Sequence, residues 1–140
     1  MNIQSTKLWK HPQIVLTILS KISELDPTVI FGNPQVYILK NKNKIVSFAA
    51  IKQRLGYQEL KAVYTYPTFR GRRYMPKLIN HISKRHKHLY LICKNSLEEF
   101  YKGLKFKKTK ERPIALILRC VLHNSTIKPF SKKELIVMKN

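Results

Sequence analysis

Hydrophobic residues follow two different spacings along this chain of 140 residues, and each spacing predicts a different kind of element. Apolar residues at i, i+3, i+4 and i+7 predict one helix that begins at Pro12 and ends at Asp26-Pro27, and another that begins near Met75. Pro76 is compatible with the second helix because the first turn needs no backbone N–H from it. The apolar stripes are Ile14, Val15, Ile18, Leu19, Ile22 and Leu25 in the first helix and Met75, Leu78, Ile79 and Ile82 in the second.

Short apolar runs bounded by turn residues predict the strands. Residues 36–39 and 45–51 flank an Asn-Lys-Asn-Lys turn and are expected to form a hairpin. Residues 60–66 follow a turn at Gly56 as the third strand of this meander, and Pro67 ends that strand.

The second half of the chain predicts a short helix between further strands. A strand is expected over residues 89–93, another from Phe106 and a long last strand over residues 114–122. The helix is expected to begin after Ser96, which would form a capping box with Glu99, and to end at Gly103.

This order of elements predicts a single α/β (α+β) domain over residues 1–140, with its core at about 12–122. The sheet is expected to be mixed, with an antiparallel meander followed by parallel strands and crossover helices. Residues 123–140 are expected to form a basic C-terminal tail with an apolar patch at 135–138.

The cysteines, the histidines and the hydropathy of the chain indicate in which compartment the protein works and whether it binds a metal. Cys93 and Cys120 lie in apolar runs, which favours buried free thiols in a reducing compartment, and they are too few for a cysteine zinc site. The histidines lack the spacing of a metal site, so no metal is expected. No run reaches the roughly 18 apolar residues of a membrane span, and the N-terminal residues do not form a secretory signal, so the expected location is cytoplasmic.

The net charge is unusual: 28 Lys and Arg residues against 7 Asp and Glu residues give +21. The excess is greatest in residues 51–110. Such a charge favours contact with a polyanion such as nucleic acid, a ribosome or an acidic membrane surface. A general lysine richness that serves only solubility is the alternative.

Residues 65–75 read Thr-Tyr-Pro-Thr-Phe-Arg-Gly-Arg-Arg-Tyr-Met and lead directly into the predicted helix at Met75. The beginning of a helix offers unpaired N–H groups and a partial positive charge, so this arginine-rich loop is a candidate pyrophosphate site.

Two stretches resemble the GNAT (GCN5-related N-acetyltransferase) superfamily. Residues 66–71 look like a strand end and the opening of the acetyl-CoA loop, and residues 95–106 look like the second signature. The family loop reads Arg/Gln-x-x-Gly-x-Gly/Ala; Arg70 fits, whereas Arg73 and Met75 occupy the positions of the glycines. Lys105 likewise stands where the second signature has a glycine.

The resemblance implies acetyl-CoA as the cosubstrate and assigns roles to particular residues. Thr65 would pair through its backbone with the pantetheine arm, where two parallel strands splay, and Asn95 would contact CoA. Tyr101 matches a general acid, and Glu59 is placed as some family members place a general base. The remaining cofactor-binding positions are Tyr66, at the strand end, and the backbone of Arg70, Gly71, Arg72, Arg73, Tyr74 and Met75.

Alternatives stay open for these roles. Tyr101 could be a packing aromatic residue, and Glu59 an exposed strand-end residue paired with a lysine. Arg73 and Met75 could obstruct the loop, or Arg73 could contact a phosphate.

Two functions are consistent with the sequence. The first is an acetyl-CoA-dependent N-acetyltransferase that acts on a primary amine carried on or near a polyanion such as tRNA, the ribosome or nucleic acid. The second is an inactive GNAT-fold module of viral or mobile-element type that binds nucleic acid or protein. Because many members of the superfamily are dimers, a homodimer is also open.

Overall fold

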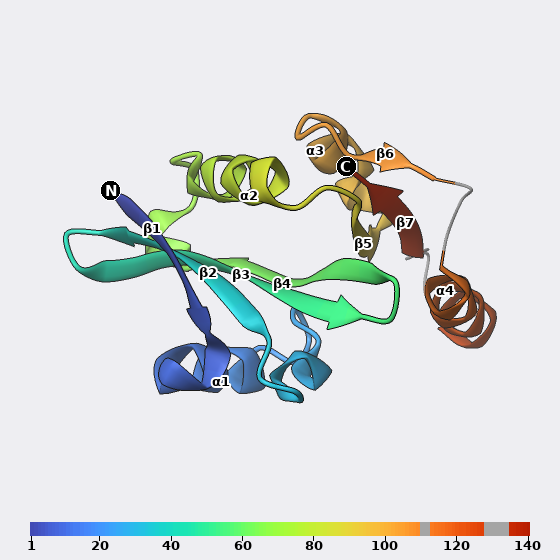
Figure 1. The fold of residues 1–140 in the computed structure, drawn as a ribbon, viewed down its shortest axis with the longest axis horizontal. Helices are drawn as coiled ribbons and strands as arrows, with labels where there is room; N and C mark the ends of the chain where they lie inside the picture. The colour runs from blue at the N-terminus through green and yellow to red at the C-terminus, as the bar shows by residue number, and fades with distance from the viewer. Residues whose placement is uncertain (110–112, 128–134) are drawn as a thin grey trace.

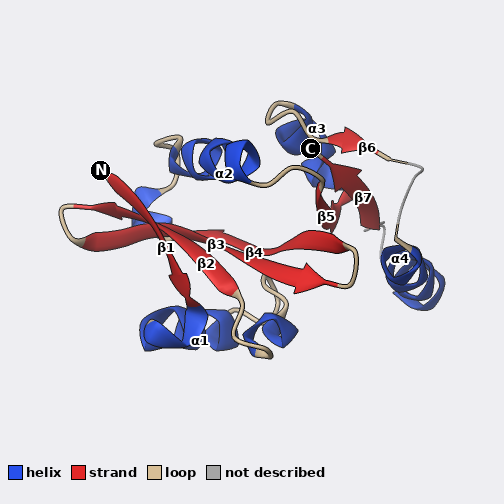
Figure 2. Cartoon of the chain, in the orientation of Figure 1, coloured by secondary structure: helices blue, strands red, loops and turns tan. Residues whose placement is uncertain are grey.

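The computed structural model describes residues 1–109, 113–127 and 135–140 and contains a twisted, mixed sheet of seven strands. Helix α1 (Pro12–Ser20) covers one face of the sheet, and helix α2 (Tyr74–Arg85) covers the other (Figure 1). Helices α3 (Glu98–Lys102) and α4 (Ile114–Ile127) lie at the end of the sheet that is formed by the last three strands of the chain (Figure 2). The strands are β1 (Asn2–Lys7), β2 (Gln35–Asn41), β3 (Lys44–Arg54), β4 (Tyr57–Thr65), β5 (Leu89–Lys94), β6 (Lys107–Lys108) and β7 (Leu135–Lys139).

Strand order in the sheet is β1-β2-β3-β4-β5-β7-β6. All neighbours are antiparallel except β4 and β5, which are parallel. The parallel pairing covers only Gln58↔Leu89 to Leu60↔Leu91, although both strands continue beyond it. The two strands therefore diverge toward their carboxyl ends.

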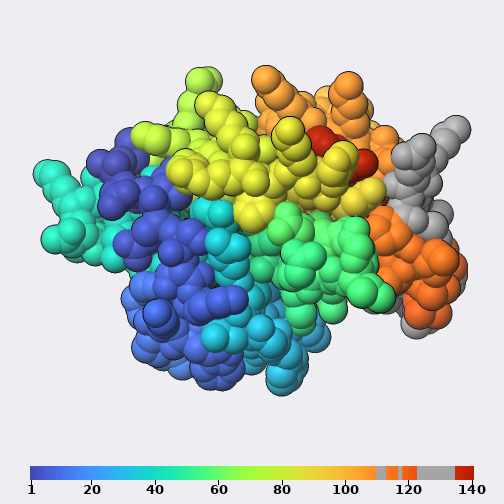
Figure 3. Space-filling view, in the orientation of Figure 1, coloured from blue at the N-terminus to red at the C-terminus, as the bar shows by residue number. Residues whose placement is uncertain are grey.

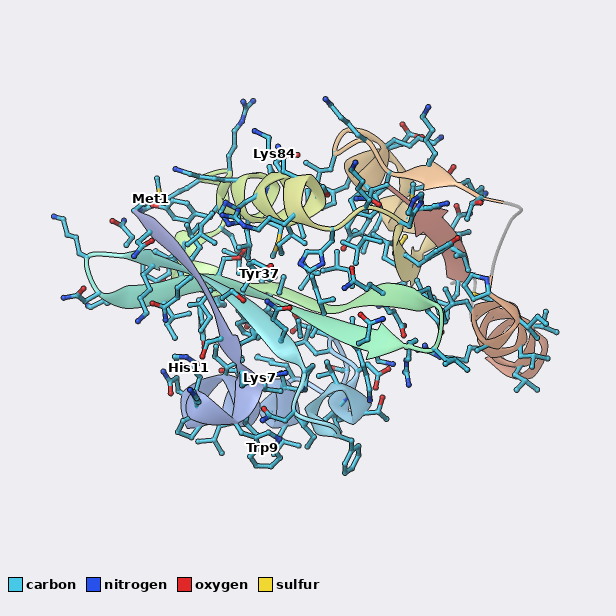
Figure 4. The ribbon with its side chains drawn as sticks, viewed as in Figure 1. Met1, Lys7, Trp9, His11, Tyr37 and Lys84 are labelled. Atoms are coloured by element: carbon cyan, nitrogen blue, oxygen red, sulfur yellow. The ribbon has the colours of Figure 1, made fainter. Side chains whose placement is uncertain are left out.

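Two hydrophobic layers hold the helices on the sheet. On one face, Ile14 and Ile18 of α1 pack with Phe48 and Tyr64. The other face packs against Leu78 and the neighbouring apolar residues of α2. Figure 4 shows the same division, with Trp9 on the α1 side and Tyr37 between the sheet and α2.

The predicted meander and mixed sheet are confirmed, as is the burial of both free cysteines. The helices predicted from Pro12 and from Met75 are both present, but the first ends at Ser20 instead of Asp26. Residues 21–25 form a turn, from which Leu25 still reaches the core.

The prediction of a strand over residues 114–122 is wrong, because this segment begins helix α4. A continuously apolar run does not distinguish a strand from a helix by periodicity. Leu116 and Cys120, four residues apart as on one face of a helix, are both buried against β5 and β7.

Two strands lie outside the predicted set. The polar residues of Asn2–Lys7 form β1 at the edge of the sheet, and part of the predicted tail forms β7, between β5 and β6. Strands β5 and β7 are antiparallel, so only β4 and β5 meet the expectation of adjacent parallel strands. The capping box is also wrong: Ser96 lies in a 3-10 turn, and α3 begins at Glu98 without a side-chain cap among the described residues.

No helix in the described ranges is long and apolar enough to cross a membrane.

Candidate functional site

The loop between β4 and α2 has the backbone geometry of a glycine-rich loop, with one glycine. Gly71 has φ +77° and open space around its Cβ position. Arg73 precedes α2 with φ 58° and ψ 22°, the left-handed conformation that glycine adopts most easily. Arg73 therefore adopts a glycine-like conformation at the position where the GNAT pattern has a glycine.

Five consecutive backbone N–H groups, from Gly71 to Met75, have no hydrogen-bond acceptor among the described residues. The first bond at this end of the helix runs from the N–H of Lys77 to the carbonyl of Arg73, at 3.2 Å. The first turn of α2 contains no acidic side chain. Unpaired donors and the positive end of a helix of 12 residues favour an anion here.

This loop forms one wall of a cavity of about 580 Å³. A smaller cavity of about 250 Å³ lies where β4 and β5 diverge. The cavities share four lining residues, so they adjoin: Glu24, Leu25, Val63 and Leu97. Because the parallel pairing ends at Leu60↔Leu91, Val63 has no partner residue in β5. The result is a path from the loop to the diverging strands.

Tyr101 is buried and lines the smaller cavity together with Cys93. Burial, and to a smaller extent the neighbouring Cys93, raise the pKa of the Tyr101 hydroxyl, which stays protonated at neutral pH. Its ring makes edge contacts with Phe100 and Phe106. No described residue forms a hydrogen bond with its hydroxyl. Tyr101 is thus both a packing residue and an available proton donor.

Arg70 connects the loop to the strand end. Its Nε donates to the backbone carbonyl of Thr65 at 3.1 Å, and its guanidinium lies 5.6 Å from the centre of the Tyr64 ring. Its Nη2 lies 3.5 Å from Oε2 of Glu24. The backbone of Thr65 is expected to pair with the pantetheine arm, but in this structure its carbonyl is engaged by Arg70. Tyr66 contributes its hydroxyl to a 2.9 Å hydrogen bond with Thr17 of α1 and lines neither cavity.

Arg73 and Met75 leave the cavity open. Met75 packs against the core, with its sulfur 3.9 Å from Oγ of Ser47, and the side chain of Arg73 is exposed. The volume of about 580 Å³ remains with both side chains in place.

Glu59 lies outside both cavities, and it is not the exposed residue of the alternative interpretation. It is buried, with Arg119 of α4 at 2.7 Å, Arg54 at 3.3 Å and Lys61 at 3.9 Å. Two arginines and one lysine thus bind the carboxylate of Glu59, which does not reach the loop between β4 and α2. Asn95 is exposed and also lines neither cavity.

Several lining residues of the cavities were not found from the sequence, among them Glu24 and Leu25 in the turn after α1. These two reach the site through tertiary packing, and no local motif marks them. Phe100 of α3 was not assigned to the site either, although it lies within the stretch 95–106 that resembles the second signature.

No protein-family model matches the sequence, and no curated protein matches it either. Solved structures do match. ElaA from Escherichia coli is 15% identical, with a TM-score of 0.67 over 100% of this chain and 99% of that one. The catalytic domain of the Tetrahymena GCN5 histone acetyltransferase, in complex with coenzyme A, is 14% identical, with a TM-score of 0.66 over 99% of this chain and 90% of that one.

An aminoglycoside 6'-N-acetyltransferase complexed with coenzyme A is 13% identical, with a TM-score of 0.66 over 100% of this chain and 96% of that one. The chain therefore has the GNAT fold.

Proposed function

We propose that this protein is an acetyl-CoA-dependent N-acetyltransferase that acts on a primary amine. The observation that carries the proposal is the continuity of the site. Five N–H groups without an acceptor in the described part of the chain belong to residues that line a cavity, and this cavity adjoins the diverging strands beside Tyr101. The coenzyme A in the complexes of the GCN5 and aminoglycoside acetyltransferases supports the same ligand class for this fold.

The residues of the site suit the parts of that cosubstrate. The N–H groups of residues 71–75, with the exposed side chains of Arg72 and Arg73, would bind the pyrophosphate. Val63 and Leu97 form walls common to both cavities and would contact the pantetheine arm. Tyr101 would donate its hydroxyl proton to the departing sulfur, as a general acid. The roles of Glu59 and Asn95 receive no support from their positions.

Calorimetric titration with acetyl-CoA tests this proposal. Gly71→Val should weaken binding at least tenfold, because a β-branched residue is strained at positive φ and would distort the loop. Gly32→Val is the matched control, since Gly32 also has positive φ (+82°) and open space but lies outside both cavities. The absence of binding to the wild-type protein at millimolar acetyl-CoA would overturn the proposal.

A second observation favours an acceptor carried on a polyanion. A hollow of about 790 Å³ lies at the α3, β6 and β7 end of the molecule and has no acidic lining residue among those described. Lys102 and Lys108 in its wall also pair with Glu98. The lining residues are His88, Lys102, Lys105, Lys107, Lys108, Thr109, Lys139 and Asn140. We propose nucleic acid phosphates as the partner of this surface, in an active enzyme or, if acetyl-CoA does not bind, in a binding module.

A further inference from the structure

We infer that Glu24 is the catalytic base of this site, taking the proton from the acceptor amine. The inference rests on the proposed acetyltransfer and assigns to the turn after α1 the role that the sequence pattern had placed on β4. It follows from the position of Glu24, from the engagement of the other nearby carboxylates and from the proton balance of the reaction.

Glu24 lies where the two cavities meet, because it lines both of them. The turn that carries it is ordered by two backbone hydrogen bonds to the carbonyl of Lys21, from Glu24 at 2.9 Å and from Leu25 at 2.7 Å. The side chain of Leu25 is buried in the core layer under α1 and anchors the turn. A carboxylate is thus held at the junction between the loop cavity and the cavity that contains Tyr101.

The other nearby carboxylates are already engaged. Asp26 also lines the smaller cavity, but it accepts from Lys61 at 2.7 Å and from the N–H and hydroxyl of Thr28. Although burial alone would raise its pKa, these hydrogen bonds outweigh burial and lower the pKa to about 2. Glu59 is enclosed by cations and lines neither cavity. Both are therefore poor proton acceptors for a substrate in the cavity.

Unlike Asp26 and Glu59, Glu24 is exposed and only weakly paired. Its side chain is 48% exposed, and its one ion pair with a described residue is the 3.5 Å contact with Arg70. That distance is longer than the roughly 2.7–2.9 Å of a strong charge-assisted hydrogen bond. The ion pair between two exposed groups is weak, so an ammonium group entering the cavity can replace Arg70 as the partner of Glu24.

The proton balance gives Glu24 a defined task. Glu24 removes a proton from the ammonium form of the acceptor, and the resulting lone pair on nitrogen attacks the thioester carbonyl. The new C–N bond forms as the C–S bond breaks, and Tyr101 protonates the departing sulfur. The second proton lost by nitrogen returns to Tyr101 through water, and Glu24 releases its proton to solvent. One proton is liberated for each amide formed.

Two amines that differ in basicity test this role. n-Butylamine is protonated at neutral pH and needs a base, whereas 2,2,2-trifluoroethylamine is largely unprotonated. Glu24→Gln should lower kcat/KM for n-butylamine by about 100-fold at neutral pH, the lower end of the range for a general base. The loss for trifluoroethylamine should stay below about threefold, and Glu24→Asp should recover part of the rate with n-butylamine.

Glu99→Gln is the matched control, because Glu99 is an exposed glutamate of α3 that lines neither cavity. Equal losses with both amines would overturn the base role in favour of a structural one, and so would an unchanged rate with n-butylamine. In both cases the wild-type enzyme would still transfer acetyl groups, so the proposed function would stand. A wild-type protein that acetylates neither amine and does not bind acetyl-CoA would overturn the proposed function and this inference together.

Discussion

At the residue scale, Arg73 shows how the loop keeps its shape without the glycine of the family pattern. A left-handed conformation costs a non-glycine residue roughly 1–2 kcal/mol. Arg73→Gly should therefore raise the free energy of unfolding by up to about 1 kcal/mol, after allowance for the greater freedom of glycine in the unfolded chain. Urea unfolding measures this change.

Arg72→Gly is the control for the lost charge, because Arg72 lies in the same loop without positive φ. It should leave the free energy of unfolding unchanged or lower it. Equal effects of the two substitutions would contradict the strain at Arg73.

Tyr101 allows a second prediction at this scale. Tyr101→Phe should lower kcat by about 100-fold and leave the dissociation constant of acetyl-CoA unchanged, since only the proton donor is lost. Stopped-flow detection of free thiol and calorimetry separate the two effects. Tyr90→Phe, a buried tyrosine outside both cavities, is the control. Unchanged turnover in Tyr101→Phe would remove it from the acid role.

At the element scale, a buried charge cluster connects α4 to β4. Glu59 is 2% exposed and receives cations from β3, β4 and α4. Glu59→Gln should lower the free energy of unfolding by about 1.5 kcal/mol, because it weakens the charge-assisted hydrogen bonds from Arg54 and Arg119. The loss stays moderate because both arginines are about one-third exposed to solvent and Lys61 keeps Asp26 as a partner at 2.7 Å. Urea unfolding tests this, with Glu99→Gln as a surface control. Figure 3 shows α4 at the end of the molecule, where this cluster contributes to its attachment.

The connection from α2 to β5 predicts a pH dependence. His86 donates from Nδ1 to the amide oxygen of Gln58 and shares a hydrogen bond between its Nε2 and the hydroxyl of Tyr37, both at 2.8 Å. Burial, and then Arg85, lower its pKa. The unfolded chain thus binds a proton first, and the free energy of unfolding should decrease as the pH falls through about 6.5.

Unfolding in urea at about pH 7.5 and about pH 5.5 measures this decrease. His86→Gln should reduce the difference between the two pH values. It should not abolish it, because burial also lowers the pKa of His81 and His11. An undiminished difference in His86→Gln would exclude His86 as a contributor.

How far the sequence predicts this structure also depends on the element. The meander and α2 were predictable because turn residues and helical spacing mark them locally. Helix α4 was not, since its apolar run fits either period, and its neighbours in space decide. In the site, the loop had a local motif, whereas Glu24 reaches it only through the fold. The burial of Glu59 likewise depends on an arginine distant in sequence.

At the scale of the whole molecule, the net charge of +21 predicts the behaviour toward nucleic acids. Affinity for RNA or DNA should fall by about tenfold or more between about 50 and 200 mM salt. Binding of the protein releases counterions from the nucleic acid, and a higher salt concentration opposes that release. Lys105→Glu combined with Lys107→Glu should weaken binding more than the same changes at Lys42 and Lys44, which lie at the β2–β3 turn. Fluorescence anisotropy measures both effects.

A flat response to salt, or no binding at low salt, would reject the polyanion partner. Equal effects of the two lysine pairs would indicate that nucleic acid contacts the whole surface and not specifically the hollow at β6 and β7.

The position of β7 in the sheet has a consequence for biosynthesis. Strand β7 pairs with β5 on one side and β6 on the other, although it follows both in the chain. A ribosome therefore releases β5 and β6 before the strand that joins them exists, and the nascent chain carries an unpaired edge at Tyr90–Lys94. Such edges template pairing with other chains. Assembly of this half of the sheet thus has to wait for the last strand, while the meander of β2, β3 and β4 can pair earlier.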